Sequence, residues 1–303
     1  MNDHVTISTY QVFGLFPHEE AARKYLEGRR WPNGITCPIC NNTERVTPRN
    51  HGFYRCNPCK LDFTVRTGTV FGRSHVPLHK WLYAMYLLIT ARKGISSLQL
   101  SKEIGITQKS AWFVLHRLLE ACGTKLETLK GTVEVDETFI GDLENNKHMY
   151  ERVTKGVAEK TPVIGLRQRG GNTLARVLES AGGLAIRSVI TQNVEPGSRL
   201  MGDENASYTK LRTSYNLQTV RHGINEYVRG DVHNNGVESV WALLRRGLHG
   251  VYHKASRKHL GRYLNEFAFR LNAGNVTRHT LERLDSLVLG VVGKRITYAD
   301  LTA

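Results

Sequence analysis

No apolar run in this sequence reaches the roughly 18–20 residues that a membrane-spanning helix needs, so no membrane partner is predicted. The N-terminal stretch MNDHVTISTYQVFGLF lacks a basic segment followed by an apolar core, and we therefore expect no signal peptide. Internal repeats and low-complexity tracts are also missing. These absences predict a cytoplasmic protein whose cysteines stay reduced, associated with the nucleoid if its partner is DNA.

Acidic residues are scarce. The chain of 303 residues has 27 Asp and Glu against 42 Lys and Arg, which gives a formal charge of +15. This excess predicts a polyanionic partner such as DNA. A ribosomal or membrane-surface protein would carry a similar balance, so charge alone does not decide between these classes. The length is sufficient for two or three modules with at least one sizeable core.

Only five cysteines are present, and four of them form two CxxC pairs: Cys37 and Cys40, then Cys56 and Cys59. Four thiolates at this spacing suit tetrahedral Zn²⁺, whereas disulfides would be expected in a secreted protein. We therefore predict one structural zinc ion per chain, held by a zinc ribbon within residues 1–75. The ribbon is basic enough to contact DNA phosphates, and docking to another protein is the alternative role.

Residues 76–130 predict a helix-turn-helix. After an apolar helix come two short helices, 96–104 and 108–119, which a three-residue turn joins. The second short helix starts with three polar residues that can reach base edges or phosphates, and we predict them to bind DNA: Gln108, Lys109 and Ser110. Helical hairpins without DNA are common, but the basic ribbon before this one favours DNA binding.

Residues 131–275 predict a mixed α/β sheet. The elements follow in the order three strands, helix, strand, helix, strand, helix, which is compatible with a first strand lying beside the fourth. Asp136 lies within the first strand, where a charged side chain is costly unless it is paired, exposed or bound to a metal. Asp203 ends the fourth strand, and Glu238 lies on a helix that we predict over residues 231–247.

These three carboxylates would converge in that arrangement. Carboxylate oxygens are the ligands that Mg²⁺ or Mn²⁺ prefers, and two such ions can act together on a phosphodiester. Glu238 and Arg245 lie seven residues apart and so share one helix face, for which a surface salt bridge is the alternative reading. His222 and His233 are candidates for the same pocket, although hydrogen-bonded structural histidines are commoner.

Together these motifs resemble the DDE transposases, and more narrowly the bacterial insertion-sequence transposases with an N-terminal zinc ribbon that are related to the Merlin elements. The resemblance covers about residues 20–275. The matching stretches are CPIC…CNPC, FTVRTGTVFGRSHVPLHKWLYAMYLL, VEVDETFIG, DENASYTKL and HNNGVESVWALLRRGLHGVYHKASRKHLGRYLNEFAFRLN. It implies a multidomain α+β or α/β protein whose catalytic core is a ribonuclease-H-like mixed sheet with flanking helices.

The resemblance also implies site residues. Asp136, Asp203 and Glu238 would form the triad that holds two Mg²⁺ or Mn²⁺ ions. Arg245 would face the DNA. Asn235, one helical turn before Glu238, is the alternative third catalytic residue.

The implied function is a DNA transposase that binds terminal inverted repeats and catalyses metal-dependent phosphodiester hydrolysis and 3′-OH strand transfer of an insertion sequence. A homodimer or larger synaptic assembly is expected, because two element ends must be cut together. A DNA-binding regulator with an inactive core, a host nuclease and a zinc-ribbon scaffold are the rivals; the intact acidic positions favour an active enzyme. Residues 276–303 are expected to form a helical tail without an assigned role.

Overall fold

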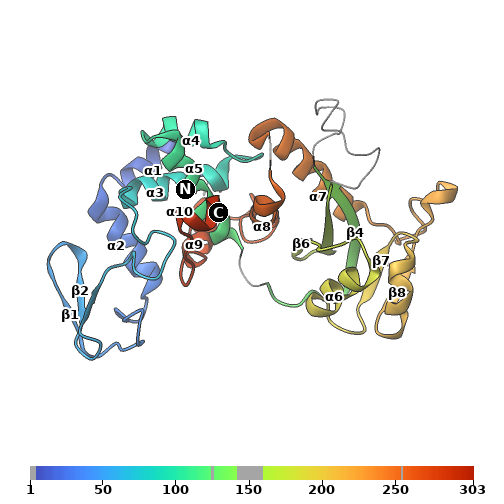
Figure 1. The fold of residues 1–303 in the computed structure, drawn as a ribbon, viewed down its shortest axis with the longest axis horizontal. Helices are drawn as coiled ribbons and strands as arrows, with labels where there is room; N and C mark the ends of the chain where they lie inside the picture. Colours follow the sequence, from blue (N-terminus) through green and yellow to red (C-terminus); the bar gives the residue numbers. More distant parts are fainter. Residues whose placement is uncertain (1–4, 124–125, 142–159, 254) are drawn as a thin grey trace. The chain divides into compact units, whose positions relative to one another are not determined.

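The computed structural model describes residues 5–123, 126–141, 160–253 and 255–303. The chain forms two compact units (Figure 1), the first made of Met1–Thr124 with Ala273–Ala303 and the second of Lys125–Asn272. The C-terminal residues therefore cluster with the N-terminal part of the chain. In the described part of the chain, every helix is too short or too polar to cross a membrane.

Helices dominate the first unit. Its central helix, α3 (Leu78–Thr90), is apolar on most sides, and nine of its 13 residues are buried. The other helices of this unit are α1 (Thr9–Leu15), α2 (Glu19–Arg30), α4 (Ser97–Ile104), α5 (Gln108–Cys122), α9 (Thr280–Leu289) and α10 (Tyr298–Thr302). Five of them, α1, α2, α4, α5 and α9, pack against α3. The buried guanidinium of Arg283 on α9 donates to the carbonyl oxygen of Ile89 on α3 at 2.9 Å, which ties the C-terminal segment to this core.

The predicted helix-turn-helix is present as α4, a three-residue turn and α5. Thr107 is the N-cap of α5, since its hydroxyl accepts from the backbone N–H of Ser110 at 3.2 Å. Ser96 caps α4 in the same way, accepting from the N–H of Gln99 at 3.1 Å. Local capping thus fixes where both helices begin.

The ribbon is a small antiparallel sheet of three strands in the order β1-β2-β3. These strands are β1 (Val46–Pro48), β2 (Tyr54–Cys56) and β3 (Leu61–Phe63), with a short 3-10 turn, η1 (Asn50–Gly52), between the first two. Trp31, Tyr54 and Phe63 pack their rings at centroid distances of 5.6–5.9 Å. This aromatic cluster is the apolar core of a module that is too small to build a larger one.

The second unit is built on a five-stranded sheet in the order β6-β5-β4-β7-β8. The strands are β4 (Thr132–Ile140), β5 (Thr161–Gln168), β6 (Thr173–Val177), β7 (Arg199–Gly202) and β8 (Asn216–Thr219). The other elements are α6 (Gly183–Asn193), η4 (Ala206–Thr213), η5 (His222–Ile224), α7 (Asn235–Gly247), η6 (Leu248–Tyr252) and α8 (Arg257–Leu271). β7 runs parallel to β4, so the first strand of this unit does lie beside the fourth, as predicted.

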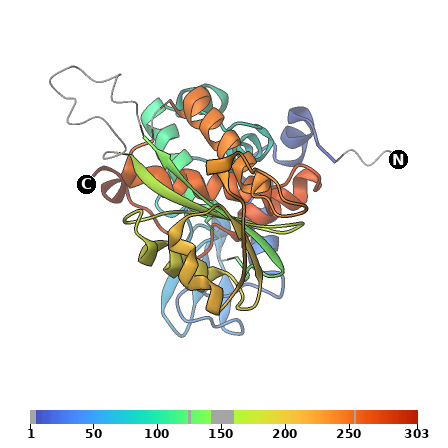
Figure 2. The same ribbon diagram turned by 90° about the vertical axis from the view of Figure 1, so that its right-hand side faces the viewer.

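The two faces of β4 differ because its side chains alternate. Val133 and Val135 point into a core that includes Ile186 and Ile190 of α6. The intervening polar side chains point to the other face, on which α7 packs against β4 and β5. Figures 1 and 2 show α6 and α7 on opposite sides of the sheet. The result is a mixed sheet with flanking helices within a multidomain α+β protein.

The helix predicted from residue 231 begins four residues later, at Asn235. Arg229 and Val232 exchange two backbone hydrogen bonds of 3.0 Å, and this tight pairing holds the chain out of a helical conformation. The prediction of the helix start was therefore wrong, while its end at Gly247 is confirmed.

Candidate active site

The four ribbon cysteines converge. Their sulfur atoms all lie within 4.8 Å of one another, and the pair Cys40 and Cys56 is separated by 3.5 Å. Four thiolates around zinc stand about 3.8 Å apart if each Zn–S bond is about 2.3 Å, so the group fits a tetrahedral ion. Asn41 and Lys60, which follow the second cysteine of each pair, have φ angles of 59° and 54° and turn the backbone out of each knuckle.

Purified full-length protein should contain one zinc ion per chain by elemental analysis. Cys56→Ser should lower this content to near zero, since Cys56 is fully buried within the cysteine cluster and the ion carries much of the folding free energy of so small a module. Cys122→Ala is the matched control, because Cys122 belongs to the helical core and lies outside the cluster. Zinc-free wild-type protein, or equal loss in the control, would contradict a ribbon site.

The three residues predicted to read DNA are exposed at the start of α5: Gln108, Lys109 and Ser110. Gln108 donates to the hydroxyl of Ser97 at 2.9 Å, and Lys109 Nζ lies 4.8 Å from the ring centroid of Tyr298. Their exposure is compatible with contact to DNA, and that role stays a prediction.

In the second unit, strand register brings Asp136 and Asp203 to the same level. β4 and β7 pair in parallel with Glu134 opposite Met201. Asp136 lies two residues after Glu134, and Asp203 lies two residues after Met201. Because side chains alternate along a strand, both aspartates lie on the face that Glu134 occupies. Asp203 follows the last residue of β7, and its Oδ1 accepts from the backbone N–H of Asn205 at 3.0 Å.

A ladder of three hydrogen bonds fastens α7 along β4. The donors lie four residues apart on the helix and the acceptors two apart on the strand: Val237 N to Glu134 Oε2 at 3.0 Å, Trp241 Nε1 to Asp136 Oδ2 at 2.9 Å, and Arg245 Nη2 to Thr138 Oγ1. Four helical residues rise about 6 Å and two strand residues about 6.6 Å, so helix and strand stay in step. Glu238 follows the first donor directly and lies one turn before Trp241, which places it beside this ladder.

The three carboxylates share one electrostatic environment. The pKa of Asp136 is raised to about 6, chiefly by burial and also by the charges of Asp203 and Glu238, while the indole N–H of Trp241 acts in the opposite direction. A neighbouring carboxyl, Glu137, has its pKa raised to about 7 by burial and by both aspartates, although it accepts a hydrogen bond from the Tyr208 hydroxyl at 2.6 Å. Carboxylates that repel one another in this way are the oxygen donors that a divalent cation stabilises.

Their spacing is looser than that of the cysteines. Within the described residues, only the cysteine group brings three or more potential ligand atoms within 4.8 Å of one another. Glu238, Asn235 and Arg245 are all exposed on α7. The structure thus brings Asp136, Asp203 and Glu238 within electrostatic range, and their chemistry fits Mg²⁺ or Mn²⁺.

Sequence reasoning missed Glu134, which is 2% exposed beneath the start of α7. Its Oε1 accepts from Arg169 Nε at 2.8 Å, and Arg169 also donates to the carbonyl oxygens of Asp231 and His233 at 2.8 and 3.0 Å. A Cβ at Gly236 would lie 2.4 Å from Glu134 Oε2, so only glycine lets the helix approach this closely. The available signal was the period of two that puts Glu134 on the same strand face as Asp136.

The pocket of the triad has two histidine candidates, His233 and His222. His233 is half-buried, with Nδ1 3.0 Å from Arg169 Nη2 and 3.5 Å from Glu134 Oε1, so it belongs to the network around Glu134. The side chain of His222 lies outside the described residues.

Gly165 is where the sheet makes room for Trp241. It pairs with Asp136 across β4 and β5, and a Cβ there would lie 2.5 Å from Trp241 Cζ2 and 2.8 Å from Val237 Cγ2. Gly165→Ala should displace the indole from Asp136 and destabilise the protein by about 1–3 kcal/mol. Thermal unfolding and tryptophan fluorescence would measure both effects.

The matched control is Gly261→Ala in the interior of α8, where a Cβ meets nothing within 4 Å. This change should be neutral or stabilising by up to about 1 kcal/mol. If Gly165→Ala melts at the temperature of the wild type, the close packing of Trp241 on the sheet is unimportant.

Known protein families match both the sheet-containing unit and the ribbon of this chain. Residues 128–272 match the family profile of the ISXO2-like transposase domain, and residues 17–62 match that of the transposase zinc-ribbon domain. The chain is also 31% identical over 274 residues to a protein of Halobacterium salinarum described as an uncharacterized protein in transposable element ISH50. That similarity covers 84% of this chain and 91% of the relative. The chain therefore belongs to the insertion-sequence transposases that join an N-terminal zinc ribbon to an ISXO2-like transposase domain.

Proposed function

We propose that this transposase cuts DNA at the ends of its insertion sequence and joins the freed 3′ ends to target DNA, with Asp136, Asp203 and Glu238 as the metal-binding triad. Action on DNA follows from the family itself. The observation that carries the assignment of the triad is the parallel pairing of β4 with β7 beneath α7, which brings Asp136 and Asp203 to the same level. The raised pKa of Asp136, to which both other carboxylates contribute, supports it. A buried carboxyl close to other carboxylates destabilises the fold when it is ionised, and such a group is a suitable ligand for a cation.

Two divalent cations, when bound, would activate the attacking oxygen and stabilise the leaving oxygen of a phosphodiester. Other residues of the chain hold the proposed ligands in position. Trp241 fixes the Asp136 carboxylate by its indole N–H, and Glu134 fixes the first turn of α7 through the N–H of Val237. Arg245, held by the hydroxyl of Thr138 on the same strand, would bind a DNA phosphate close to the triad.

Each chemical step exchanges one P–O bond for another. In the first step water attacks the phosphorus at the element end, the bond to the 3′ oxygen breaks, and that oxygen leaves as a hydroxyl. In the second step this 3′-OH attacks a phosphodiester of the target and displaces the target's own 3′ oxygen. No covalent link between protein and DNA forms, so no serine or tyrosine nucleophile is needed.

The first unit would supply DNA recognition. Gln108, Lys109 and Ser110 would contact the terminal inverted repeats from the exposed start of α5. A homodimer or larger assembly would hold the two element ends together. Glu238 is preferred over Asn235 as the third ligand, because Glu238 carries the charge that affects Asp136.

The test uses full-length protein with duplexes that carry an element end, either uncut or pre-cut with a free 3′-OH, and a supercoiled target plasmid. With Mg²⁺ or Mn²⁺ we expect cutting of the first substrate and joining of the second to the plasmid. Binding without cutting would indicate a regulator with an inactive core. Cutting without joining would indicate a nuclease.

A further inference from the structure

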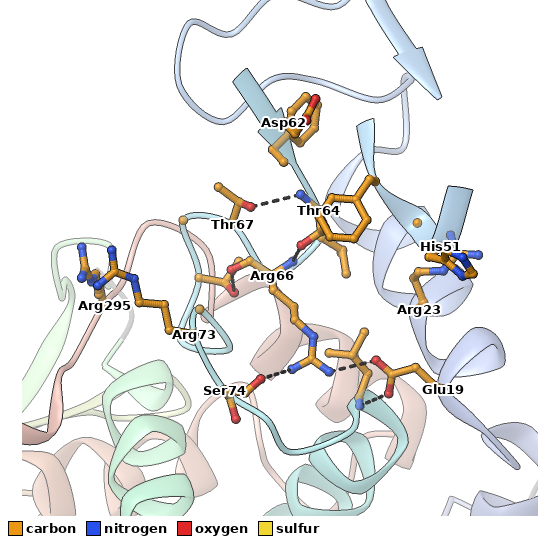
Figure 3. A pocket seen from close by; sticks show the side chains of 18 residues that line it. Glu19, Arg23, His51, Asp62, Thr64, Arg66, Thr67, Arg73, Ser74 and Arg295 are labelled. Atoms are coloured by element: carbon orange, nitrogen blue, oxygen red, sulfur yellow. Dashed lines mark hydrogen bonds and ion pairs between the residues drawn. The ribbon is translucent and has the colours of Figure 1, made fainter. Parts of the chain in front are cut away.

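A cavity lies in the first unit. Its volume is about 540 Å³, and its walls come from the ribbon, the loop of residues 64–74, the start of α2 and Arg295 near the C-terminus. Figure 3 shows this cavity with its charged side chains. The cavity therefore combines segments from both ends of the sequence.

Most charges around this cavity are compensated within the protein. Arg66 donates to Glu19 at 2.8 Å and to the carbonyl oxygens of Ser74 and Val76 at 3.2 and 3.0 Å. Arg23 donates to both carboxylate oxygens of Glu27 at 3.0 Å. Asp62 faces Arg55 and Arg49 at 3.4 and 3.8 Å. These groups hold the walls of the cavity together.

Arg73 and Arg295 form an uncompensated arginine pair. Among the described residues, neither guanidinium has a hydrogen-bond partner or an acidic group within 4.0 Å, and both residues are exposed. Both line the same cavity, and Figure 3 shows them at the same side of it. Two cations on one cavity wall without a counter-charge favour an anion there.

Backbone contacts hold together the two segments that carry the arginine pair. Arg73 has a φ of 54°, a left-handed conformation that is strained for a residue with a side chain and that concentrates at functional sites. The loop before it pairs with the C-terminal segment, since the N–H of Gly293 donates to the carbonyl oxygen of Gly68 at 2.9 Å. This pairing holds the backbone of the loop beside that of the C-terminal segment.

Lys294, the residue directly before Arg295, is anchored to the end of α5. Its ammonium group donates to the carbonyl oxygens of Glu120 and Gly123 at 2.7 Å each, at the C-terminal end of α5. The ammonium group of Lys294 thus caps the C-terminal end of α5, where a positive charge is favourable, and its hydrogen bonds are made within the protein. Arg295, one residue on, is left to face outward.

The anion is expected to be part of a long chain. A neighbouring cavity of about 430 Å³ lies beside the ribbon knuckle and shares Gly68 and Arg295 with the first. It is lined by Arg30, whose pKa is lowered to about 10 by burial and which donates to the carbonyl oxygen of Val65. Arg295 thus borders two adjoining hollows, an arrangement that suits a polymer passing from one to the other.

We propose that Arg73 and Arg295 clamp a backbone phosphate of DNA against the zinc ribbon. The guanidinium groups offer paired N–H donors that match phosphate oxygens. This inference rests on DNA as the substrate of the proposed function, but not on the chemistry of the triad. Because phosphates are the same at every base, the clamp holds DNA without reading its sequence.

The experiment measures DNA binding by full-length protein without added Mg²⁺, using fluorescence anisotropy over about 50–300 mM salt. One duplex carries an element end and another of equal length is scrambled. Arg73→Ala/Arg295→Ala should weaken binding to both duplexes by about 10-fold near physiological salt. It should also reduce the slope of log K against log salt by about 1, as expected for the loss of one phosphate contact.

The matched control is Arg92→Ala/Lys93→Ala, which removes two exposed positive charges of the same unit after α3. It should change affinity by less than about 2-fold, because screening weakens distant charges. Arg73→Lys/Arg295→Lys should recover part of the loss and the salt slope. Zinc content and thermal unfolding of each variant establish that the fold is retained.

The proposal is overturned if Arg73→Ala/Arg295→Ala binds like the wild type, if the control loses as much affinity, or if only the element-end duplex is affected. These outcomes do not depend on cutting or joining. A protein that binds DNA through the clamp but never joins ends would refute the catalytic proposal and leave the clamp standing.

Discussion

Asp136→Asn, Asp203→Asn and Glu238→Gln are each expected to lower DNA cutting and joining by about 10³-fold or more, with DNA affinity changed by less than about 2-fold. Each change keeps the size of the side chain and removes the negative charge that a divalent cation needs. A loss of about 4 kcal/mol in stabilisation of the transition state corresponds to a factor of about 10³. Single-turnover assays with uncut and pre-cut duplexes would measure both steps.

Asn235→Ala tests whether Glu238 or Asn235 is the third residue of the metal-binding triad. Asn235 lies one turn before Glu238 and is exposed at the start of α7. A modest effect of Asn235→Ala beside a large effect of Glu238→Gln is the expected pattern. Full activity of Glu238→Gln together with an inactive Asn235→Ala would transfer the role to the asparagine.

Asp136→Asn has a second expected consequence, which does not depend on activity. The pKa of Asp136 is about 6 in the folded protein and 3.8 as the ordinary value, so the unfolded chain binds fewer protons between these pH values. Stability without divalent cations therefore falls as pH rises through this window and stays lower above it. Asp136→Asn should then raise the free energy of unfolding at pH 8 by roughly 1–3 kcal/mol, measurable by thermal unfolding. A lower stability would show that Asp136 is a structural group.

Glu134→Ala is expected to cost about 3 kcal/mol or more in the free energy of unfolding. The change removes a carboxylate that is 2% exposed, leaves Arg169 without its charge partner, and deprives the N–H of Val237 of its acceptor. Because α7 carries Glu238, cutting and joining should fall as well. Glu134→Gln keeps an acceptor but loses the charge, and its cost should be smaller.

Asp231→Ala is the matched control for Glu134→Ala. The Asp231 side chain is 63% exposed and its ion pair with Arg199 is solvent-screened, so its loss should leave the free energy of unfolding nearly unchanged. Calorimetry of the full chain would compare the variants. Equal losses in both would mean that burial of Glu134 adds nothing to the anchoring of α7.

The features that sequence predicted are those with local or periodic signals. The spacing of Cys37 to Cys59 predicted the ribbon, because tetrahedral thiolate coordination permits few spacings. The alternation from Val133 to Thr138 predicted β4, and the order of elements predicted β7 as its parallel neighbour. Asp136, Asp203 and Glu238 were proposed as a group from their positions on a strand, a strand end and a helix.

What sequence did not predict depends on contacts between distant residues. The structural role of Glu134 could not be predicted, because its partner Arg169 lies 35 residues further along the chain. The start of α7 was misplaced because the pairing of Arg229 with Val232 overrides helix propensity. Arg295 had no assigned role because its neighbourhood depends on the pairing of Val292 with Thr69.

The hydrogen bonds between α7 and β4 constrain how this part of the gene can change in length. Deleting one residue between Val237 and Arg245 would rotate the rest of the helix by about 100°, so that Trp241 or Arg245 would no longer meet its strand partner. Inserting one residue in β4 between Glu134 and Thr138 would turn the following side chains to the opposite side of the sheet. Insertions and deletions are therefore expected in the connecting loops of this unit, while these two segments keep a fixed number of codons.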